Sequence, residues 1–387
     1  MKKITIGIFN DSFYPMSDGV ISVIDNYAKR LVKYANVIVF VPKYKEEYDD
    51  SRFNYKVVRC KSIKTPIYVY ALPVPDLDKE FKKELNKYKL DIVHIHSPFT
   101  IGKAGIKYAK KHHIPVIATM HSQFKQDFQR AFKSEFVSRK LNDDFIIKPF
   151  EKCDECWAVN SEVARIFHED YGYKTMPRVM DNATEMLPIK NKKEVIKEIK
   201  DKHNIKDEKV FLFVGRINKL KNIFFIADSL ELLKDKMNFK MIFIGNGPDE
   251  EEFKEYVNTL DIKDRIIFTG KITDRELLAK YYATADLFLF PSLYDASSIV
   301  QIEAASQSTP TLFLYGAATS ATVKEDYTGY FSNNDPKDYA KKIIEIFEDD
   351  KKYKEISKNI LKDLYVNWDD KIKEVYNLYL ELIENNK

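Results

Sequence analysis

Short runs of apolar and β-branched residues alternate with longer segments in which apolar residues recur every three or four positions, along almost the entire chain. The short runs predict strands, and the longer segments predict helices, for example over residues 20–33, 102–112 and 161–170. Strands that alternate with helices build βαβ units, which make parallel sheets covered by helices. The pattern therefore places the chain in the α/β class. The expected strands are residues 4–9, 37–41, 55–58, 92–95, 116–119 and 156–159 in the first half, and 210–214, 241–244, 265–268, 287–290 and 311–314 in the second.

The 387 residues are too many for one ordinary core, so we expect two domains. Residues 189–206 are rich in Lys, Glu and Asp and separate the two series of strands, so they are interpreted as a linker. We predict two Rossmann-like, doubly wound parallel-sheet domains over residues 1–188 and 207–367. Residues 368–387 have the spacing of a long helix that packs on something other than its sequence neighbours. Two such domains facing each other would bring the carboxyl ends of their strands to one central cleft, where ligands of this fold class bind.

Composition and charge exclude several classes of protein. Hydrophobic residues make up 44% of the chain, which excludes long disordered regions, and a net charge of +4 gives no reason to expect a nucleic-acid partner. No apolar stretch approaches the roughly 18 residues of a membrane-spanning helix, and the N-terminal MKKITIGIFN lacks the apolar core of a signal peptide. Cys153-Asp-Glu-Cys156 is spaced like half of a zinc site, but the sequence has no second pair. We therefore expect a cytoplasmic protein with reduced thiols and no bound metal ion.

Two positions in the first half have the chemistry of a ligand site. Gly19 follows the first expected strand and begins a helix, where backbone N–H groups and the helix dipole favour an anion. His121 follows the strand at residues 116–119, so its imidazole is expected at that strand's carboxyl end, within reach of a sugar hydroxyl or a phosphate. His94 and His96 fall within or near a strand and are expected in the core or behind the site. An ordinary strand-to-helix turn is the alternative for the Gly19 loop.

A basic loop follows the first expected strand of the second half. Arg216 and Lys221 flank the turn into the next helix, and both can converge there on a phosphate group. A diphosphate leaving group needs its developing charge neutralised, and without a metal ion this task falls to cations and N–H groups. A solvated basic turn in a Lys-rich protein is the alternative.

A loop with two carboxylates follows the strand at residues 287–290. Asp295 is expected at the mouth of a helix and Glu303 inside it, a spacing that suits contact with the hydroxyls of two sugar rings. Ser297 or Ser298 is a good N-cap residue. The alternative is a helix-capping Asp with an incidental surface Glu. The backbone N–H groups expected to bind phosphate at the start of this helix are those of Ser298, Ile299 and Val300.

In their order and spacing, these motifs resemble the retaining glycosyltransferases of family 4, which have the GT-B fold. The motifs of the second half are Gly215-Arg216…Lys221, Gly245-Asn-Gly247-Pro248, Phe268-Thr-Gly270-Lys271, Phe290-Pro291-Ser292 with a carboxylate close behind, and Glu303-Ala-Ala…Thr309-Pro310. In the first half, Ser97-Pro-Phe…Gly102 and Met120-His121-Ser122 match the branch that includes bacterial diacylglycerol glucosyltransferases. The resemblance covers nearly the whole chain.

The resemblance implies roles around the donor. Arg216 and Lys221 would bind the donor diphosphate, with Gly19 nearby, and His121 would lie beside the donor sugar. The backbone near Ile272 would contact the base. The terminal helix would cross back to the first domain.

The resemblance also implies roles for the two carboxylates. Asp295 stands where the family has the first Glu of its E-x7-E motif, and it would touch the transferred sugar. Glu303 matches the second Glu and would hold the ribose hydroxyls. The usual Glu-Gly-Phe-Gly is Asp295-Ala-Ser-Ser298 here, and Asp is one methylene shorter than Glu, which alters its reach to the sugar.

The implied reaction moves a hexose-type sugar from a nucleotide diphosphate, with a UDP-sugar favoured, to a lipid or glycan acceptor. It needs no metal ion or other cofactor and proceeds by front-face attack, with the diphosphate oxygen helping to deprotonate the acceptor. A catalytically degenerate partner or scaffold subunit stays open as an alternative, because the Asp295 loop departs from the family. Another GT-B enzyme, such as a nucleotide-sugar epimerase, stays open as well.

An aromatic and basic segment points to the acceptor side. On one helix its spacing would make an aromatic stripe flanked by cations, which suits peripheral contact of residues 124–140 with an anionic membrane surface. Such contact is compatible with a lipid acceptor, and an aromatic stripe packed in the core is the alternative. The aromatic residues are Phe124, Phe128, Phe132 and Phe136, and the basic ones are Lys125, Arg130, Lys133, Arg139 and Lys140.

Overall fold

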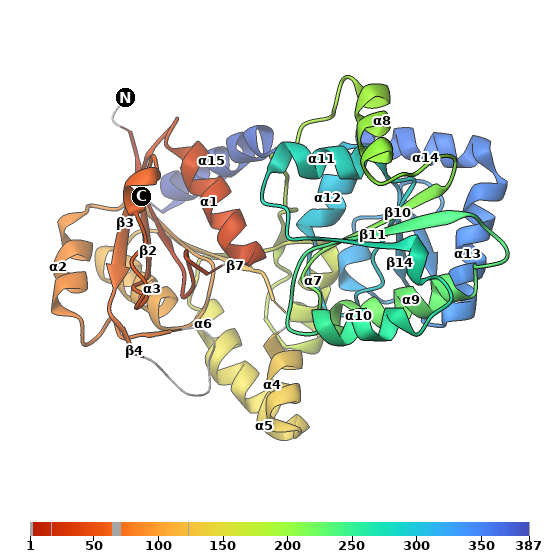
Figure 1. Cartoon of the computed structure of the whole chain (residues 1–387). Coiled ribbons are helices and arrows are strands. Elements are labelled where there is room, and N and C mark those ends of the chain that lie inside the picture. The colour runs from red at the N-terminus through yellow and green to blue at the C-terminus, as the bar shows by residue number, and fades with distance from the viewer. Residues whose placement is uncertain (1–2, 17, 64–70, 123, 387) are drawn as a thin grey trace. The chain divides into compact units, whose positions relative to one another are not determined.

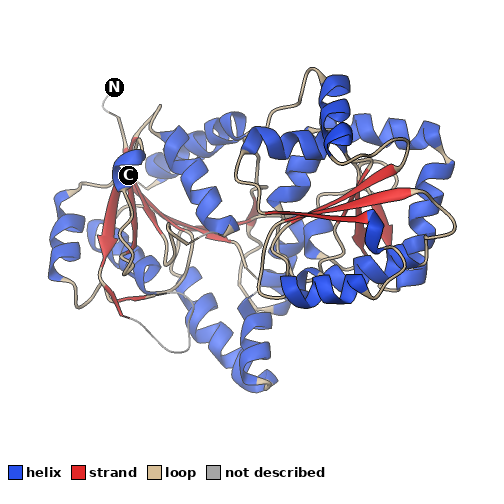
Figure 2. Ribbon diagram, viewed as in Figure 1, coloured by secondary structure: helices blue, strands red, loops and turns tan. Residues whose placement is uncertain are grey.

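A computed structural model divides the chain into two compact units, one of Met1–Asn182 with Trp368–Lys387 and one of Ala183–Asn367. The structure describes residues 3–16, 18–63, 71–122 and 124–386, so Ser17 of the first loop lies outside it. Both units are α/β and alternate strands with helices, which confirms the predicted fold class (Figure 1, Figure 2).

The segment expected to be a linker is part of the second unit. Its helix α8 (Lys192–Lys202) packs against α11 (Arg275–Thr284). The ring nitrogen Nε2 of His203 lies 2.8 Å from the hydroxyl of Tyr281, which ties the end of α8 to that helix. The unit boundary accordingly falls after Asn182 rather than after residue 188.

The N-terminal domain is built on a parallel sheet in the order β3-β2-β1-β6-β7-β8-β9. The central strands are buried on both faces, which explains why the sequence there reads as continuous apolar runs. A short antiparallel pair, β4 (Ser62–Ile63) and β5 (Leu72–Pro73), lies outside this sheet. The strands of the sheet are β1 (Thr5–Phe9), β2 (Asn36–Pro42), β3 (Lys56–Cys60), β6 (Ile92–Ile95), β7 (Val116–Met120), β8 (Glu155–Ala158) and β9 (Arg178–Val179).

The C-terminal helix α15 (Trp368–Asn385) belongs to the N-terminal domain, where it packs against α1. Tyr379 is fully buried, and its ring stacks on that of Trp157, with ring centres 5.9 Å apart. Two π-helical segments, Asp143–Ile147 and Ile166–Asp170, follow α5 and α7. The other helices of this domain are α1 (Gly19–Leu31), α2 (Lys79–Lys87), α3 (Thr100–His112), α4 (Phe124–Phe132), α5 (Glu135–Asn142), α6 (Lys148–Phe150) and α7 (Ser161–Arg165).

The C-terminal domain repeats the architecture with a parallel sheet in the order β12-β11-β10-β13-β14-β15. Its core is rich in aromatic rings, for example Phe243, which contacts Phe253 and Phe268. The strands are β10 (Lys209–Val214), β11 (Phe239–Ile244), β12 (Ile266–Gly270), β13 (Leu287–Leu289), β14 (Thr311–Leu314) and β15 (Tyr330–Ser332). The helices besides α8 and α11 are α9 (Ile223–Glu231), α10 (Glu250–Asn258), α12 (Ile299–Ser306), α13 (Pro336–Glu348) and α14 (Asp350–Asp363).

The aromatic and basic segment is not one helix. Lys133 adopts a left-handed conformation (φ 51°) that ends α4, and the Ser134 side chain caps α5 by accepting a hydrogen bond from the N–H of Val137. Phe124 and Phe128 are partly buried, whereas Phe132 and Phe136 are 53% and 78% exposed. The single aromatic stripe expected from the spacing is therefore wrong. Over the described part of the chain, no helix combines the length and apolarity needed to cross a membrane.

Candidate active site

Most of the predicted site residues follow the strands at which the strand order of each sheet reverses, whereas His121 follows β7 and Ile272 follows β12. In the N-terminal sheet the chain runs from β1 to β2 and β3, and then returns to β6 on the other side of β1. In the C-terminal sheet it runs from β10 to β11 and β12, and then returns to β13 on the other side of β10. In doubly wound folds such a switch point leaves a crevice at the carboxyl ends of the two strands, where ligands bind. The loop with Arg216 and Lys221 follows β10, and the loop with Asp295 follows β13.

The loop after β10 is held rigidly by its neighbours. Asn218 caps the short 3₁₀ turn Lys219–Lys221 by accepting a hydrogen bond of 3.1 Å from the N–H of Lys221. Asn222 then takes a left-handed conformation (φ 61°), which Asn tolerates better than most residues. From there its side-chain amide donates to the carbonyl of Pro291, 3.2 Å away, and ties this loop to the one after β13.

Two glycines allow the loop after β10 to pack on the loop after β11. A Cβ atom at Gly245 would lie 1.8 Å from the carbonyl oxygen of Gly215, and one at Gly247 would lie 2.1 Å from that of Ile217. The N–H of Ile217 donates to the carbonyl of Asn246 at 3.0 Å, which completes the contact. The Gly245-Asn-Gly247 motif therefore positions the backbone next to Arg216.

Lys221 and Asp295 form an ion pair across the switch point. The two side chains are 18% and 17% exposed, so the pair is largely shielded from solvent. Ser292 is fully buried and donates a hydrogen bond of 2.7 Å to the second oxygen of Asp295. An ammonium group has three N–H donors, so pairing with Asp295 leaves others for a ligand.

Glu303 lies in a separate cluster, and it is not an incidental surface residue. Its carboxylate is 5% exposed, pairs with the Arg275 guanidinium and accepts a 3.0 Å hydrogen bond from the hydroxyl of Tyr282. Burial, with the neighbouring Glu303 charge, raises the pKa of Tyr282 well above its usual value, so this phenol stays protonated and donates. Arg275 also lies 3.6 Å from a carboxylate oxygen of Glu185.

The start of α12 differs from the prediction in one respect. Ser298 occupies the N-cap position, but its side chain makes no capping hydrogen bond. Ile299 and Val300 form the first turn and are partly buried. Ile272 is partly buried and packs against the domain core just beyond β12.

In the N-terminal domain the corresponding switch point is organised by Asp11. Its carboxylate accepts hydrogen bonds from the Ser97 hydroxyl at 2.6 Å, from the Thr100 hydroxyl at 2.8 Å, and from the N–H groups of Ile101 and Gly102 at the start of α3. Burial raises the pKa of Asp11 above its usual value, although these hydrogen bonds oppose the shift. Asp11 therefore fixes the loop after β1 to the loop after β6.

Gly19 is the first residue of α1, and its surroundings are open. Asp18 caps the helix by accepting a hydrogen bond of 2.8 Å from the N–H of Ile21. Gly19 is exposed, and a Cβ atom placed there meets no atom within 4 Å. The space next to the backbone of Gly19 is therefore open.

His121 is partly exposed at the carboxyl end of β7, where the sequence places it. Its Nε2 atom lies 2.9 Å from Nδ1 of His96, and the two rings stack with centres 5.1 Å apart. Burial lowers the pKa of His121 to about 3, so its ring is neutral near pH 7. His94 and His96 are buried, as expected, but His96 is in direct contact with the candidate site residue.

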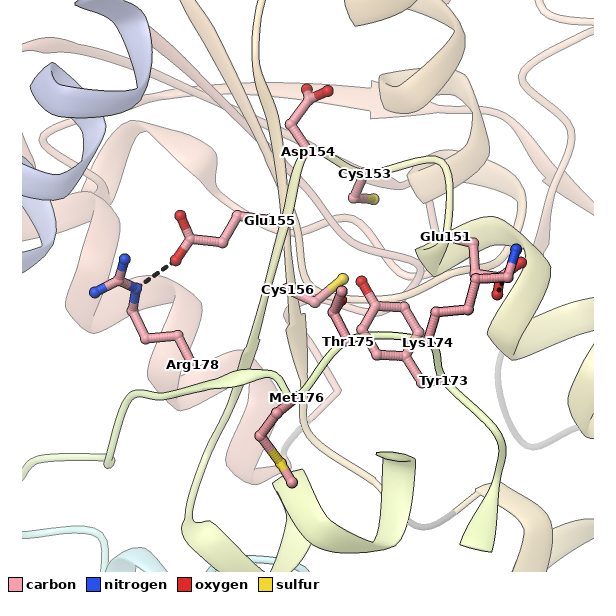
Figure 3. A pocket seen from close by; sticks show the side chains of 10 residues that line it. All are labelled: Glu151, Cys153, Asp154, Glu155, Cys156, Tyr173, Lys174, Thr175, Met176 and Arg178. Atoms are coloured by element: carbon pink, nitrogen blue, oxygen red, sulfur yellow. Dashed lines mark hydrogen bonds and ion pairs between the residues drawn. The ribbon is translucent and has the colours of Figure 1, made fainter. Parts of the chain in front are cut away.

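A pocket of about 550 Å³ lies elsewhere, at the amino end of β8 (Figure 3). Its lining residues are Glu151, Cys153, Asp154, Glu155, Cys156, Tyr173, Lys174, Thr175, Met176 and Arg178. It contains none of the predicted site residues, and Arg178 is paired there with Glu155. The neighbouring Cys156 thiol and burial raise the pKa of Cys153 well above its usual value, so this thiol stays protonated. Among the described residues, no three or more His, Cys, Asp or Glu side chains are arranged to hold a metal ion.

Several residues of the site escaped the sequence analysis. Ser292 and Asn222 lie in the two predicted loops, but roles were expected only for other residues of those loops. Arg275 and Tyr282 lie on α11, far from Glu303 in the sequence, and no local pattern pairs them with it. His96 was expected in the core or behind the site because it falls at the end of a strand, and its contact with His121 now connects it to the site.

Two family models together match most of the chain. The model described as Glycosyltransferase Family 4 matches residues 17–184, and the one described as Glycosyl transferases group 1 matches residues 195–363. These matched ranges follow the two domains, but leave out strand β1, residues 185–194 and the terminal helix α15.

Curated relatives and solved structures agree with these matches. The alpha-monoglucosyldiacylglycerol synthase of Streptococcus pneumoniae is 29% identical over 79% of this chain and 70% of its own length. The enzyme of the same name from Acholeplasma laidlawii is 28% identical over 98% of both chains. In fold, a sucrose-phosphate synthase from Thermosynechococcus elongatus aligns with a TM-score of 0.81 at 19% identity, covering 99% of this chain and 100% of the other. An Anabaena protein solved in complex with UDP and glucose aligns with a TM-score of 0.73 at 13% identity, covering 97% of this chain and 99% of the other.

Proposed function

The chain belongs to the family 4 glycosyltransferases of the GT-B fold, and from this premise we propose that it transfers a hexose-type sugar from a nucleotide diphosphate to a lipid or glycan acceptor with retention of configuration. The donor proposed is a UDP-sugar, and the reaction needs no metal ion. The observation that carries the proposal is the shielded cation Lys221, held by Asp295 at the switch point of the C-terminal sheet.

The proposed role of the β10 loop is to stabilise the leaving group. As the bond between the sugar C1 and the diphosphate oxygen breaks, negative charge develops on the diphosphate. Arg216 and Lys221 neutralise that charge from a loop already held in place by Asn218 and Asn222, so little reorganisation is needed during the reaction. The acceptor oxygen attacks C1 on the same face, and its proton passes to the departing diphosphate oxygen.

The proposed role of His121 is to bind the transferred sugar. Its neutral ring is partly exposed at the end of β7, so a donor oxygen can reach it. Asp295 contributes through its pairing with Lys221, and Glu303 remains the proposed ribose contact. Because Arg275 and Tyr282 already occupy both oxygens of Glu303, ribose hydroxyls would use its remaining lone pairs or displace Arg275.

The proposed acceptor is a membrane lipid, reached by peripheral contact with the inner face of an anionic membrane. The α4–α5 patch, defined as Phe132, Phe136 and Val137 with Lys133, Arg139 and Lys140, exposes aromatic and cationic side chains together. Amphipathic segments with exposed aromatic residues and cations bind anionic lipid surfaces. The two diacylglycerol glycolipid synthases at 28% and 29% identity support a lipid over a glycan.

The function is tested by donor binding and by loss of the two cations. UDP-glucose is the first donor to assay, by sugar transfer to a diacylglycerol-type acceptor and by calorimetry. Arg216→Ala and Lys221→Ala should each lower the transfer rate by about 10²–10³-fold, the scale of losing one charge-stabilising group. Lys219→Ala is the matched control, because Lys219 lies in the same turn but is exposed and paired with Glu252. Near-full activity of both site variants would refute the proposal, and absence of nucleotide binding would favour the degenerate partner subunit.

A further inference from the structure

His96 is a buried side chain in contact with the candidate site, and its hydrogen bonding is incomplete. Its ring is 3% exposed, and its Nδ1 atom lies 2.9 Å from Nε2 of His121. Its other nitrogen, Nε2, is buried and has no hydrogen-bond partner within the described residues. A buried polar atom without a partner costs about 1–3 kcal/mol.

Packing fixes the orientation of the His96 ring. The ring of His94 lies 4.2 Å from it, centre to centre, and the ring of Tyr27 meets it nearly at a right angle at 5.6 Å. His94 is itself held at both nitrogens, by the Tyr379 hydroxyl at 2.6 Å and the Thr119 hydroxyl at 2.7 Å. His96 therefore cannot turn to find another partner without disturbing α1, β7 and α15.

Both rings of the His96–His121 pair are neutral near pH 7. Burial, followed by the charges of His94 and His121, lowers the pKa of His96 well below its usual value, and burial lowers the pKa of His121 to about 3. Within the described residues no carboxylate hydrogen-bonds to either ring. Two neutral rings share a single hydrogen at their contact, so either His96 donates from Nδ1 or His121 donates from Nε2.

The orphaned Nε2 of His96 distinguishes the two arrangements. If His121 donated, His96 would carry its proton on Nε2, as a buried N–H without an acceptor, and such orphaned donors are rarer in proteins than unsatisfied acceptors. If His96 donates, only an unused lone pair is buried at Nε2. His121 then carries its own proton on Nδ1, because the nitrogen that accepts a hydrogen bond is the unprotonated one.

We propose that His96 is a positioning residue that holds His121 as the neutral tautomer protonated on Nδ1, so that His121 donates a hydrogen bond to an oxygen of the donor sugar or phosphate. The second half of this statement rests on the proposed function, whereas the tautomer itself does not. Nδ1 of His121 is available for this role, because its ring is partly exposed and the described residues offer it no partner.

The tautomer is tested directly on the ligand-free protein. Two-dimensional NMR that correlates the ring nitrogens with the ring carbon-bound hydrogens of ¹⁵N-histidine protein identifies which nitrogen of His121 carries the proton, and His121→Gln assigns the signals. We expect Nδ1–H for His121 and for His96 at pH 7. Nε2–H on His121 in the wild-type protein would overturn the proposal, whatever the protein's activity.

Two substitutions then separate positioning from simple packing. His96→Asn places an amide N–H near the Nδ1 position, whereas His96→Leu fills the space without a donor. His96→Leu removes the N–H that selects the tautomer, so His121 should then exchange between its two neutral tautomers, and kcat/KM should fall by about 10-fold, the effect of one hydrogen bond. His96→Asn should keep Nδ1–H and stay within about 3-fold of wild type. Equal activity of the two folded variants would overturn the role. A wild-type protein with the expected tautomer but no glycosyl transfer would instead refute the proposed function.

Discussion

At the scale of single residues, the candidate site consists of charges that are already paired. Lys221 is held by Asp295, and Arg275 by Glu303, each with a hydroxyl group that completes the carboxylate's hydrogen bonding. A carboxylate with two partners keeps its position before any ligand arrives, which lowers the entropy cost of binding. Asp295, at the position where the resemblance implies a Glu, contacts both Lys221 and Ser292.

The glycines that bring two loops together give a prediction for stability. Gly247→Ala should destabilise the C-terminal domain by about 3 kcal/mol, because its Cβ would collide with the carbonyl oxygen of Ile217, which is 2.1 Å away. Gly316→Ala is the control: its Cβ meets open space, so only the left-handed backbone (φ 81°) is penalised, at about 1 kcal/mol. Urea unfolding followed by far-UV circular dichroism measures both, and equal losses would contradict the collision argument.

At the scale of elements, helix boundaries decide which side chains reach solvent. A left-handed Lys133 separates α4 from α5, so side chains that are four residues apart in the sequence do not share one helical face. Phe124 packs edge-on against Phe99 with ring centres 5.4 Å apart, whereas Phe136 is 78% exposed. The exposed aromatic rings of the segment therefore lie in its second half.

The α4–α5 patch, as the proposed membrane contact, gives a prediction for binding to lipid vesicles. Phe136→Glu should lower co-sedimentation with vesicles containing an anionic lipid by about 10-fold or more, because it removes an inserted ring and adds a repelled charge. Leu77→Glu is the matched control, since Leu77 is equally exposed, at 80%, but lies outside the patch. Unchanged co-sedimentation of Phe136→Glu would exclude this patch as the membrane contact.

At the scale of the whole molecule, the two tryptophans of the chain report on one domain. Trp157 and Trp368 are both buried in the N-terminal unit, the second through helix α15. Their fluorescence therefore follows unfolding of the N-terminal domain, whereas circular dichroism follows both. The C-terminal domain contains neither tryptophan, so the proposed binding of a donor there is best tested by calorimetry.

The buried histidines make the N-terminal domain sensitive to acid. The unfolded chain binds protons at His94 and His96 below a pH of about 6.5, whereas burial keeps them neutral in the folded domain to far lower pH; the pKa of His94 falls to about 3. Their contribution to stability is thus complete above pH 6.5 and is lost as pH falls toward 3. Between pH 7.5 and 5.5 the free energy of unfolding should fall by about 1.4 kcal/mol per buried histidine.

Tryptophan fluorescence during urea unfolding at the two pH values measures this effect. His94→Gln retains a side chain able to hydrogen-bond with Thr119 and Tyr379 but does not titrate, so its stability should depend less on pH. A wild-type stability that does not change between these pH values would contradict the assignment of both histidines as neutral.

The α/β fold class, the presence of two domains with the same architecture and the positions of most strands could be predicted from the sequence. Strands buried on both faces need continuous apolar residues, so β1, β6, β10 and β14 can be recognised in the sequence as short apolar runs. The edge strands β9 and β15 were missed, because two or three residues are too short to show a pattern. The order of the motifs also determined the family, since spacing along the chain survives where identity is low.

Which distant side chains come into contact follows from the folded arrangement of the elements. Lys221 with Asp295, Glu303 with Arg275, and His121 with His96 are separated by 74, 28 and 25 positions, and each pair is created by parallel strands or packed helices that end together. The prediction of one aromatic helix over residues 124–140, made from local spacing, was wrong. The left-handed backbone of Lys133 ends the first helix although the apolar spacing continues. Local spacing sets which elements form, but contacts between distant elements depend on how the sheet orders its strands, and that order is a property of the folded chain.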